Sequence, residues 1–181
     1  METAVDEVKT RGIRAAASLT AAGVEFAIIG GQAIAAWVAQ VDVEAVRNTK
    51  DVDLLVKRDD LPKVIQTLEA AGFVHGVDLF LDGPDGSVRS GLHLVFAGEK
   101  VREEHPTDAP SLDHVVEAGD FPVLDLDGLV RMKLAAFRLK DQVHLLDLIE
   151  VGLIDDGWVD RVPAVLRERM RAVLQTAVDE S

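Results

Sequence analysis

Residues 47–56 read RNTKDVDLLV and place two carboxylates, Asp51 and Asp53, at the start of an apolar run. The run predicts a strand over residues 51–57. Because side chains alternate between the two faces of a strand, Asp51 and Asp53 point to one face and Val52 points to the other. Twice the rise per strand residue separates the two carboxylates by roughly 6 to 7 Å. Such a pair can bind a divalent cation, and it suits Mg²⁺, which takes few carboxylates when substrate phosphates complete its ligands.

The acidic composition offers a second explanation for this pair. Asp and Glu number 32 against 19 Lys and Arg, and the formal net charge is −13, so two acids on a solvated strand edge are an ordinary occurrence. The same charge argues against bulk binding of nucleic acids or anionic membranes. Contact with a long nucleic acid would need a local basic patch, for which the candidates are Lys100, Arg102, Arg131 and Arg138.

The length and residue content predict a folded chain without cysteine chemistry. A chain of 181 residues that is 48% apolar is large enough to build a core. It contains no cysteine, which excludes disulfides, thiolate zinc sites and cysteine nucleophiles and suits a cytoplasmic protein. No apolar run reaches about 18 residues, so we expect no membrane span.

A double glycine, Gly30-Gly31, separates the apolar run 24–29 from the helix-forming segment 32–40. A strand that ends in glycines at the start of a helix leaves unpaired N–H groups facing any anion, and the missing β-carbons let a phosphate approach the backbone. The alternative is a tight turn with no ligand. Neither a Walker lysine pattern nor GxGxxG is present, so P-loop and Rossmann folds have no support.

The remaining pattern predicts an α+β or α/β domain in which a sheet is followed by helices. A sheet domain over residues 1–124 and a helical part over 125–181, packed on it, would form a single compact unit. Residues 98–120 read as a long loop and therefore as a candidate functional segment. The expected helices are 3–22, 32–40, 59–71, 125–138, 141–151 and 163–178, and the expected strands are 24–29, 51–57, 77–82, 87–96 and 121–124, with a hairpin turn at 83–86.

The order of apolar strand, Gly-Gly, helix and R-x-T-x-D-x-D-apolar strand resembles the nucleotidyltransferase superfamily, which includes DNA polymerase beta, minimal nucleotidyltransferases and aminoglycoside nucleotidyltransferases. The twenty-residue step from Gly31 to Asp51 is closer to the abortive-infection (AbiEii-like) toxin nucleotidyltransferases. The resemblance covers about residues 24–148. It implies a mixed β-sheet flanked by helices, a nucleoside triphosphate such as ATP as substrate, and Mg²⁺ or Mn²⁺ as cofactor.

Carried over to this sequence, the resemblance implies that Gly30 and Gly31 hold the triphosphate. Asp51 and Asp53 would bind the metal ion and act in catalysis, and Thr49 would help to shape the nucleotide pocket.

Two basic residues also match positions of the superfamily, and each has an ordinary alternative. Arg47 would line the nucleotide pocket or pair with Glu44 on the surface. Lys133, on the predicted helix 125–138, matches a lysine that reaches phosphate, although a lysine on an exposed helix face would look the same.

The superfamily usually supplies a third carboxylate from a later strand, and this sequence departs from that pattern. The matching strand, residues 90–96, carries His93 at the expected position. Histidine can act as a base near neutral pH or ligate a metal, and it suits zinc or manganese better than magnesium. Glu99, just past the strand, and Asp78, on the partner strand, are the alternative third acids.

Asp141, His144 and Asp147 recur at threefold spacing and so lie near one face of a predicted helix. They could form a metal site. The alternative, a polar face that pairs with Arg138 and Lys140 or bonds to the preceding helix, is the more ordinary arrangement.

Three functions are therefore open. The first is an enzyme that transfers a nucleoside monophosphate to a hydroxyl of RNA, a protein or a small molecule, possible in a toxin-antitoxin system with an antitoxin protein as partner. The second is a nucleotide-binding or protein-interaction module on the same fold that has lost transfer. The third is an unrelated structural domain, in which the double glycine and the two acids coincide by chance.

Overall fold

The structure of the protein is a computed structural model, and it describes residues 4–47, 49, 51–76, 79–82 and 91–179. The helices are α1 (Ala4–Ala21), α2 (Gly30–Ala39), α3 (Leu61–Ala70), α4 (Leu126–Ala136), α5 (Leu139–Glu150), α6 (Trp158–Arg161) and α7 (Arg167–Asp179), with the 3₁₀ helices η1 (Arg58–Asp60) and η3 (Ala164–Leu166). The strands are β1 (Phe26–Ile29), β2 (Val52–Val56), β3 (Phe73–His75), β4 (Leu79–Asp82), β5 (Leu92–Phe96), β6 (Val115–Ala118) and β7 (Phe121–Leu124).

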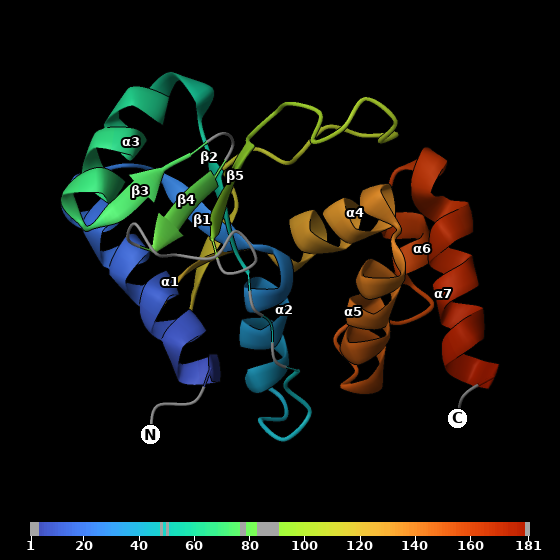
Figure 1. Ribbon diagram of the computed structural model, residues 1–181. Coiled ribbons are helices and arrows are strands. Elements are labelled where there is room, and N and C mark those ends of the chain that lie inside the picture. Colours follow the sequence, from blue (N-terminus) through green and yellow to red (C-terminus); the bar gives the residue numbers. More distant parts are fainter. Residues whose placement is uncertain (1–3, 48, 50, 77–78, 83–90, 180–181) are drawn as a thin grey trace.

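The strands form one mixed sheet in the order β3-β4-β5-β2-β1-β7-β6. In the centre of the sheet, β2 runs parallel to β5 and antiparallel to β1, and β1 runs parallel to β7. The outer pairs β3-β4, β4-β5 and β6-β7 are antiparallel. The sheet occupies one half of the molecule and helices α4 to α7 the other half (Figure 1). The predicted α+β class, a mixed sheet with a helical carboxyl-terminal part, is confirmed.

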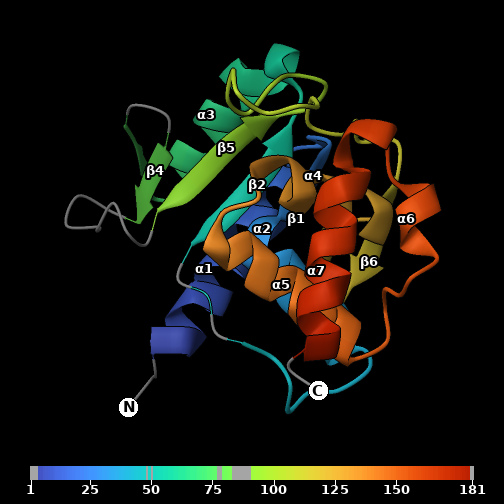
Figure 2. The ribbon, with the colours of Figure 1, turned by 90° about the vertical axis from the view of Figure 1, so that its right-hand side faces the viewer.

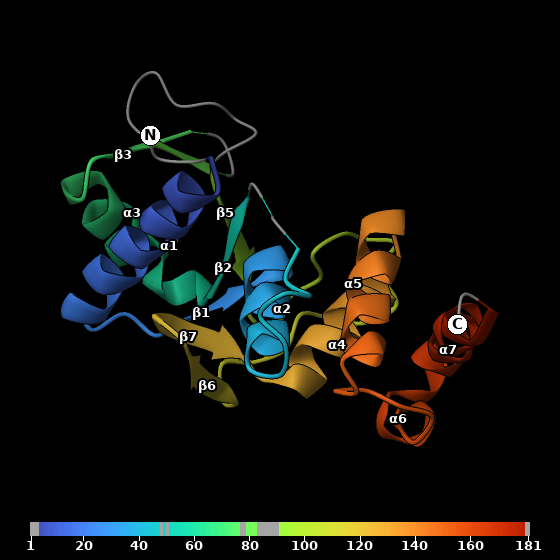
Figure 3. The same ribbon diagram turned by 90° about the horizontal axis from the view of Figure 1, so that it is seen from below.

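The helices are arranged in layers around the sheet. Seen from below, α1 and α3 cover one face and α2 covers the other, with α4, α5 and α7 beyond α2 (Figure 3). Helix α2 contacts both α4 and α5, and α5 in turn contacts α7. The view onto the carboxyl-terminal helices shows α4, α5 and α7 in front of the sheet and α6 to one side (Figure 2). No helix in the described part of the chain is both long and apolar enough to cross a bilayer.

The two central strands form the middle of the core. All four side chains of β1 are buried, as are four of the five in β2, since helices cover both faces of the sheet. The exception in β2 is Asp53, which is half-buried. A carboxylate inside a strand of Val and Leu needs a reason, because placing a charge in an apolar strand costs free energy unless the charge finds a partner.

The predicted elements correspond to the observed ones with a few corrections. Helix α2 begins at Gly30, so the double glycine forms the first turn of the helix instead of a break before it. Three short elements were not predicted, namely β3, β6 and α6, each of three or four residues. Strand β6 falls inside the segment expected to be a loop, because its apolar content of two valines is too small to stand out from the polar residues around it.

The predicted hairpin is confirmed in its pairing. Strands β4 and β5 are antiparallel neighbours, with Phe80 opposite Leu92. Strand β5 covers residues 92–96 of the expected strand 87–96, and residues 87–90 of that prediction lie outside the described residues. The predicted turn at 83–86 lies outside the described residues.

Candidate functional site

The register of the central strands brings the predicted residues together. Asp53 lies opposite Ile29 on the antiparallel neighbour β1 and opposite His93 on the parallel neighbour β5. Residues opposite one another in neighbouring strands present their side chains to the same face. Gly30 follows Ile29 directly, so helix α2 begins beside Asp53. Asp53 therefore lies between the start of a helix and a histidine.

Gly30 and Gly31 fit this place because neither has a side chain. Gly30 has a φ of 70°, in the left-handed region, and a β-carbon there would lie 2.0 Å from Asp53 Oδ2. A β-carbon on Gly31 would lie 2.7 Å from Thr49 Oγ1. The backbone at the start of α2 is thus in direct contact with Asp53 and Thr49. In the described structure, no side chain caps this helix start, so its first N–H groups are available to an anion.

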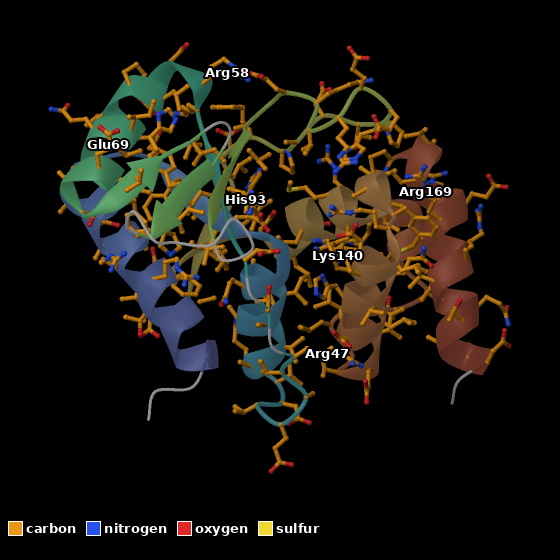
Figure 4. All side chains as sticks on the ribbon, in the orientation of Figure 1. Arg47, Arg58, Glu69, His93, Lys140 and Arg169 are labelled. Carbon is orange, nitrogen blue, oxygen red and sulfur yellow. The ribbon has the colours of Figure 1, made fainter. Side chains whose placement is uncertain are left out.

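A cavity of about 700 Å³ opens above these residues. Its floor is the sheet and the start of α2, and its other walls are α4, α5 and the segment 101–109. In Figure 4, His93 lies on the sheet side and Lys140 on the helical side of this space. The polar side chains that line the cavity are Thr49, Asp51, Asp53, His93, Arg102, His105, Thr107, Asp108, Lys133, Arg138, Lys140, Asp141 and His144.

The carboxylate of Asp53 is in an unfavourable environment for a charge. Burial raises its pKa above the ordinary value, and nearby Asp51 raises it further, while the charges of His93, Lys133 and Lys140 lower it without cancelling the effect of burial. Among the described residues, none donates a hydrogen bond to Asp53. A cation in the cavity would relieve this cost, because it would favour the ionised form.

Lys133 stands on the opposite wall in a different environment. Only 6% of it is exposed, and its Nζ donates to Asp141 Oδ1 at 3.0 Å. Burial lowers the pKa of Lys133, and the carboxylates of Asp141 and Asp53 oppose that shift. The exposed-helix alternative for Lys133 is therefore wrong, since this lysine is buried and faces the cavity.

Asp141, which is 1% exposed, is the common hydrogen-bond partner of Lys133 and Arg138 on this side of the cavity. Arg138 Nε donates to its Oδ2 at 2.7 Å, and the Arg138 backbone N–H donates to the same atom at 3.2 Å. Burial by itself would raise the pKa of Asp141, but the hydrogen bonds and charges of Arg138 and Lys133 lower it below the ordinary value. Asp141 is thus an ionised carboxylate whose partners are provided by the protein.

All the residues chosen from the sequence as site residues line this one cavity. They are Gly30, Gly31, Thr49, Asp51, Asp53, His93 and Lys133. Asp53 lies against Gly30 of the Gly30-Gly31 pair, and all three residues line the cavity. This arrangement argues against the third hypothesis, an unrelated structural domain in which the double glycine and the two acids coincide by chance.

Two of the alternatives do not lie in the cavity. Glu99 binds Arg58 through both oxygens, at 2.6 Å each, and does not line the cavity. Arg47 Nε donates to Asp147 Oδ1 at 2.6 Å, so it neither lines the cavity nor pairs with Glu44. Asp78 lies outside the described residues.

Sequence reasoning missed the contribution of the segment 101–109. His105 and Asp108 line the cavity from this segment. Two backbone hydrogen bonds hold the segment at its base, Gly98 N–H to the Ala109 carbonyl at 3.1 Å and Ala109 N–H to the Glu99 carbonyl at 2.8 Å. Its length marked it as a candidate functional loop, but nothing in its residues indicated which side chains would reach the cavity.

His144 also lines the cavity, and its role as part of a metal site finds no support. Burial, followed by the charge of Lys133, lowers its pKa to about 4, and its Nδ1 has no partner among the described residues. Asp141 and Asp147, its predicted companions, are paired with Lys133, Arg138 and Arg47.

The carboxylates of Asp51 and Asp53 suit a metal ion such as Mg²⁺, which also takes ligands from substrate phosphates. In the described part of the chain, no group of three or more acidic or histidine side chains is arranged to hold a metal by itself. Magnesium ions are commonly bound by one or two carboxylates together with substrate phosphates. Asp51 and Asp53 fit that arrangement, because both line the cavity and Asp53 accepts no hydrogen bond from the described residues.

The mixed sheet, the flanking helices and the carboxyl-terminal helices together form a nucleotidyltransferase-like fold. Among solved structures, the chain is similar to the antibiotic-resistance factor ANT(2'')-Ia, an aminoglycoside nucleotidyltransferase whose solution structure reveals substrate-regulated conformation dynamics. The similarity has a TM-score of 0.57 and covers 98% of this chain and 97% of that chain, at 17% sequence identity. At this identity it concerns the fold. No protein-family model and no curated protein matches the sequence.

Proposed function

We propose that the protein transfers a nucleoside monophosphate from a nucleoside triphosphate to an acceptor hydroxyl, with a divalent metal ion. One observation carries the proposal: the start of α2 lies so close to Asp53 that a β-carbon on Gly30 would be 2.0 Å from its carboxylate oxygen. An uncapped helix start, which could bind an anion, and a carboxylate, which could bind a metal ion, therefore lie side by side. A phosphate and its metal ion need that combination.

The triphosphate would be held from both sides of the cavity. The uncapped N–H groups at the start of α2 face it from the sheet side. Lys133, which Asp141 holds in place, offers a positive charge from α4. Thr49, in contact with Gly31, closes the edge of this phosphate site.

Asp51 and Asp53 are the residues that would hold the metal ion, Mg²⁺ or Mn²⁺. When bound, such an ion neutralises charge on the phosphates and stabilises the charge that develops during transfer. The raised pKa of Asp53 supports this assignment, because a buried carboxylate that accepts no hydrogen bond from the described residues gains the most from a cation.

The transfer itself is a displacement at the α-phosphorus. The acceptor oxygen forms a bond to that phosphorus, the bond to the oxygen bridging the α- and β-phosphates breaks, and diphosphate leaves. The proton of the acceptor hydroxyl must go to a base. His93 lies next to Asp53 in register and lines the same cavity, so we assign it this role.

The finer assignments form part of the same proposal. The acceptor is a hydroxyl of RNA, a protein or a small molecule, and ATP is the nucleotide we would test first. The resemblance of residues 24–148 to AbiEii-like toxins supports a toxin-antitoxin role in the cytoplasm with an antitoxin as partner. We treat residues 1–124 as the sheet domain and 125–181 as a helical part of the same unit, because the cavity takes residues from both.

A second function deserves a test because of His93. Where the superfamily usually has a third carboxylate, this chain has a histidine, and the described residues hold no group of three metal ligands. That observation favours a nucleotide-binding or protein-interaction module that has lost transfer.

The experiment is transfer of label from α-³²P-labelled nucleoside triphosphates, with Mg²⁺ or Mn²⁺, to cell RNA, total protein or the protein itself. We expect transfer by the wild type and none by Asp53→Ala. His93→Gln should still bind nucleotide and should transfer little, since a base contributes about 10²–10⁴-fold. Binding of nucleotide without transfer by the wild type in every condition would support the module and overturn the enzyme. Absence of nucleotide binding would overturn the enzyme and the nucleotide-binding form of the module.

A further inference from the structure

A second cavity, of about 1030 Å³, lies at the other end of α4. Its walls come from α4, α6, η3, the start of α7 and the segment 108–114, where Figure 2 shows α4, α6 and α7 together. Asp108 and Ala109 line both cavities, so the base of the segment 101–109 separates the two.

Three arginines line this cavity, and one of them is paired within the protein. Arg161 donates to Asp127 Oδ2 at 2.6 Å, and its guanidinium lies 3.9 Å from the centre of the Trp158 ring. Another acid of the cavity is also engaged, since Asp125 accepts the N–H of Gly128 at 2.9 Å at the start of α4.

The other two arginines, Arg131 of α4 and Arg167 of α7, have no partner among the described residues. Both are partly buried, and the Nε atom of each is fully buried without a hydrogen bond. Buried polar atoms are nearly always hydrogen-bonded, and a partly buried cation without a counterion lowers stability. Two cations without a partner among the described residues thus line one cavity.

The position of Arg167 adds to this unfavourable arrangement. It is the first residue of α7, a helix of 13 residues. The amino-terminal end of a helix carries a partial positive charge, so a cation there is repelled and an anion is attracted. An anion between Arg131 and Arg167 would remove both costs at once.

We propose that this second cavity binds the phosphate group of a small phosphate monoester. Guanidinium groups bind phosphate through paired, charge-assisted hydrogen bonds. The monoester is a dianion above its second pKa of about 6, and its charge matches the two unpaired guanidinium groups. The volume leaves room for the organic part of the molecule, since pockets of about 300–1,000 Å³ take small organic ligands.

The test measures binding of ribose 5-phosphate to the full chain by calorimetry. We expect Arg131→Gln and Arg167→Gln each to weaken binding about tenfold or more, since hydrogen bonds to charged groups contribute on that scale. Arg171→Gln, an exposed arginine on the same helix α7 outside both cavities, should bind as the wild type does. Lys140→Gln, which changes the first cavity, should also leave binding unchanged.

Thermal unfolding distinguishes a binding role from a structural one. In phosphate-free buffer, Arg131→Gln and Arg167→Gln should unfold at the same temperature as the wild type or higher, because each removes an uncompensated charge. With ribose 5-phosphate added, the wild type should be the more stable. Lower stability of both variants in both buffers would make the arginines structural and overturn the proposal.

Two further outcomes would also overturn it. If sodium chloride at the same ionic strength stabilises the wild type as much as ribose 5-phosphate does, the arginines respond to screening only. If inorganic phosphate binds as tightly as ribose 5-phosphate, the organic part makes no contact and the monoester assignment is wrong. None of these results depends on transfer of label from a nucleotide, so this proposal and the proposed function can fail separately.

Discussion

Two carboxylates face the same cavity from opposite walls and differ in everything else. Asp141, on the helical side, is 1% exposed and receives hydrogen bonds from Lys133 and Arg138, which lower its pKa despite its burial. Asp53, on the sheet side, receives no hydrogen bond from the described residues, and burial raises its pKa. The fold supplies hydrogen bonds to the carboxylate of Asp141, whereas the described residues supply none to that of Asp53.

This difference distinguishes an acid that positions a neighbouring side chain, Asp141, from an acid that can bind a ligand, Asp53. An acid whose lone pairs are occupied by the protein can hold a neighbour in place but has little capacity for a ligand. An acid left without partners costs stability in the free protein, and functional groups commonly carry such a cost. Asp141 thus holds Lys133 toward the cavity, whereas Asp53 is available to a cation.

The largest expected effect is on transfer of label. Asp53→Asn should reduce transfer by about 10²–10³-fold, the scale on which removal of one electrostatic contact affects catalysis. Nucleotide-transfer rates at fixed Mg²⁺ provide the measurement. Circular dichroism must show the variant to be folded. A variant that keeps the full rate would remove Asp53 from the site.

The next largest effect is on stability and concerns the ion pair between Lys133 of α4 and Asp141 of α5. Asp141→Asn should lower the free energy of unfolding by about 3–5 kcal/mol, because it leaves Lys133 buried with a weakened partner. Urea unfolding at pH 7 measures this. The double variant Lys133→Met/Asp141→Leu is the matched control and should regain most of the loss. Equal loss in both would show that the shape of the site matters and the charge pair does not.

The pH dependence of Asp141 has a defined sign. Its pKa is lowered in the folded state, so its stabilising contribution is present above the ordinary carboxyl pKa and is lost as the pH falls through the lowered value.

His144, on α5, should make the stability of the protein fall in mild acid. Its pKa in the folded protein is about 4, below the ordinary value of 6.5, so the unfolded chain binds a proton first as the pH falls. The wild type should lose on the order of 3 kcal/mol between pH 6.5 and pH 4 through this group. Urea unfolding across that range should show a smaller loss for His144→Gln. Parallel curves for the two proteins would contradict the burial of His144.

Replacement of Asp53 should change stability less than replacement of Asp141, and it should raise stability at neutral pH instead of lowering it. Its pKa is raised in the folded state, so its charge destabilises the fold at pH values above the raised pKa and has no effect below the ordinary carboxyl pKa. Asp53→Asn should therefore raise the melting temperature at pH 7 without metal or nucleotide. Each kcal/mol corresponds to about 2–4 °C for a chain of this length. The gain should disappear near pH 3 and reverse when Mg²⁺ and nucleotide are added to both proteins.

How far the sequence predicts this molecule depends on the range over which a pattern acts. Asp51, Asp53 and the double glycine could be found because strand alternation and glycine geometry are local, and the register then places His93 next to Asp53. The pairing of Lys133 with Asp141 joins two helices, and that of Arg47 with Asp147 spans 100 residues. Neither has a local signature. Strands as short as β3 and β6 exist because neighbours pair with them, and three or four residues carry too little pattern to predict them.

The smallest expected effect tests whether Glu99 serves as the third carboxylate of the site. Glu99→Gln should leave transfer of label unchanged, because Glu99 binds Arg58 at 2.6 Å through both oxygens and does not line the cavity. The rate measured beside that of Asp53→Asn, under the same conditions, decides the matter. Arg58→Gln is the matched control and should behave in the same way, since it removes the other partner of the same exposed ion pair. A loss of transfer in Glu99→Gln but not in Arg58→Gln would mean that Glu99 turns into the site during the reaction, and His93 would then no longer be needed as the base.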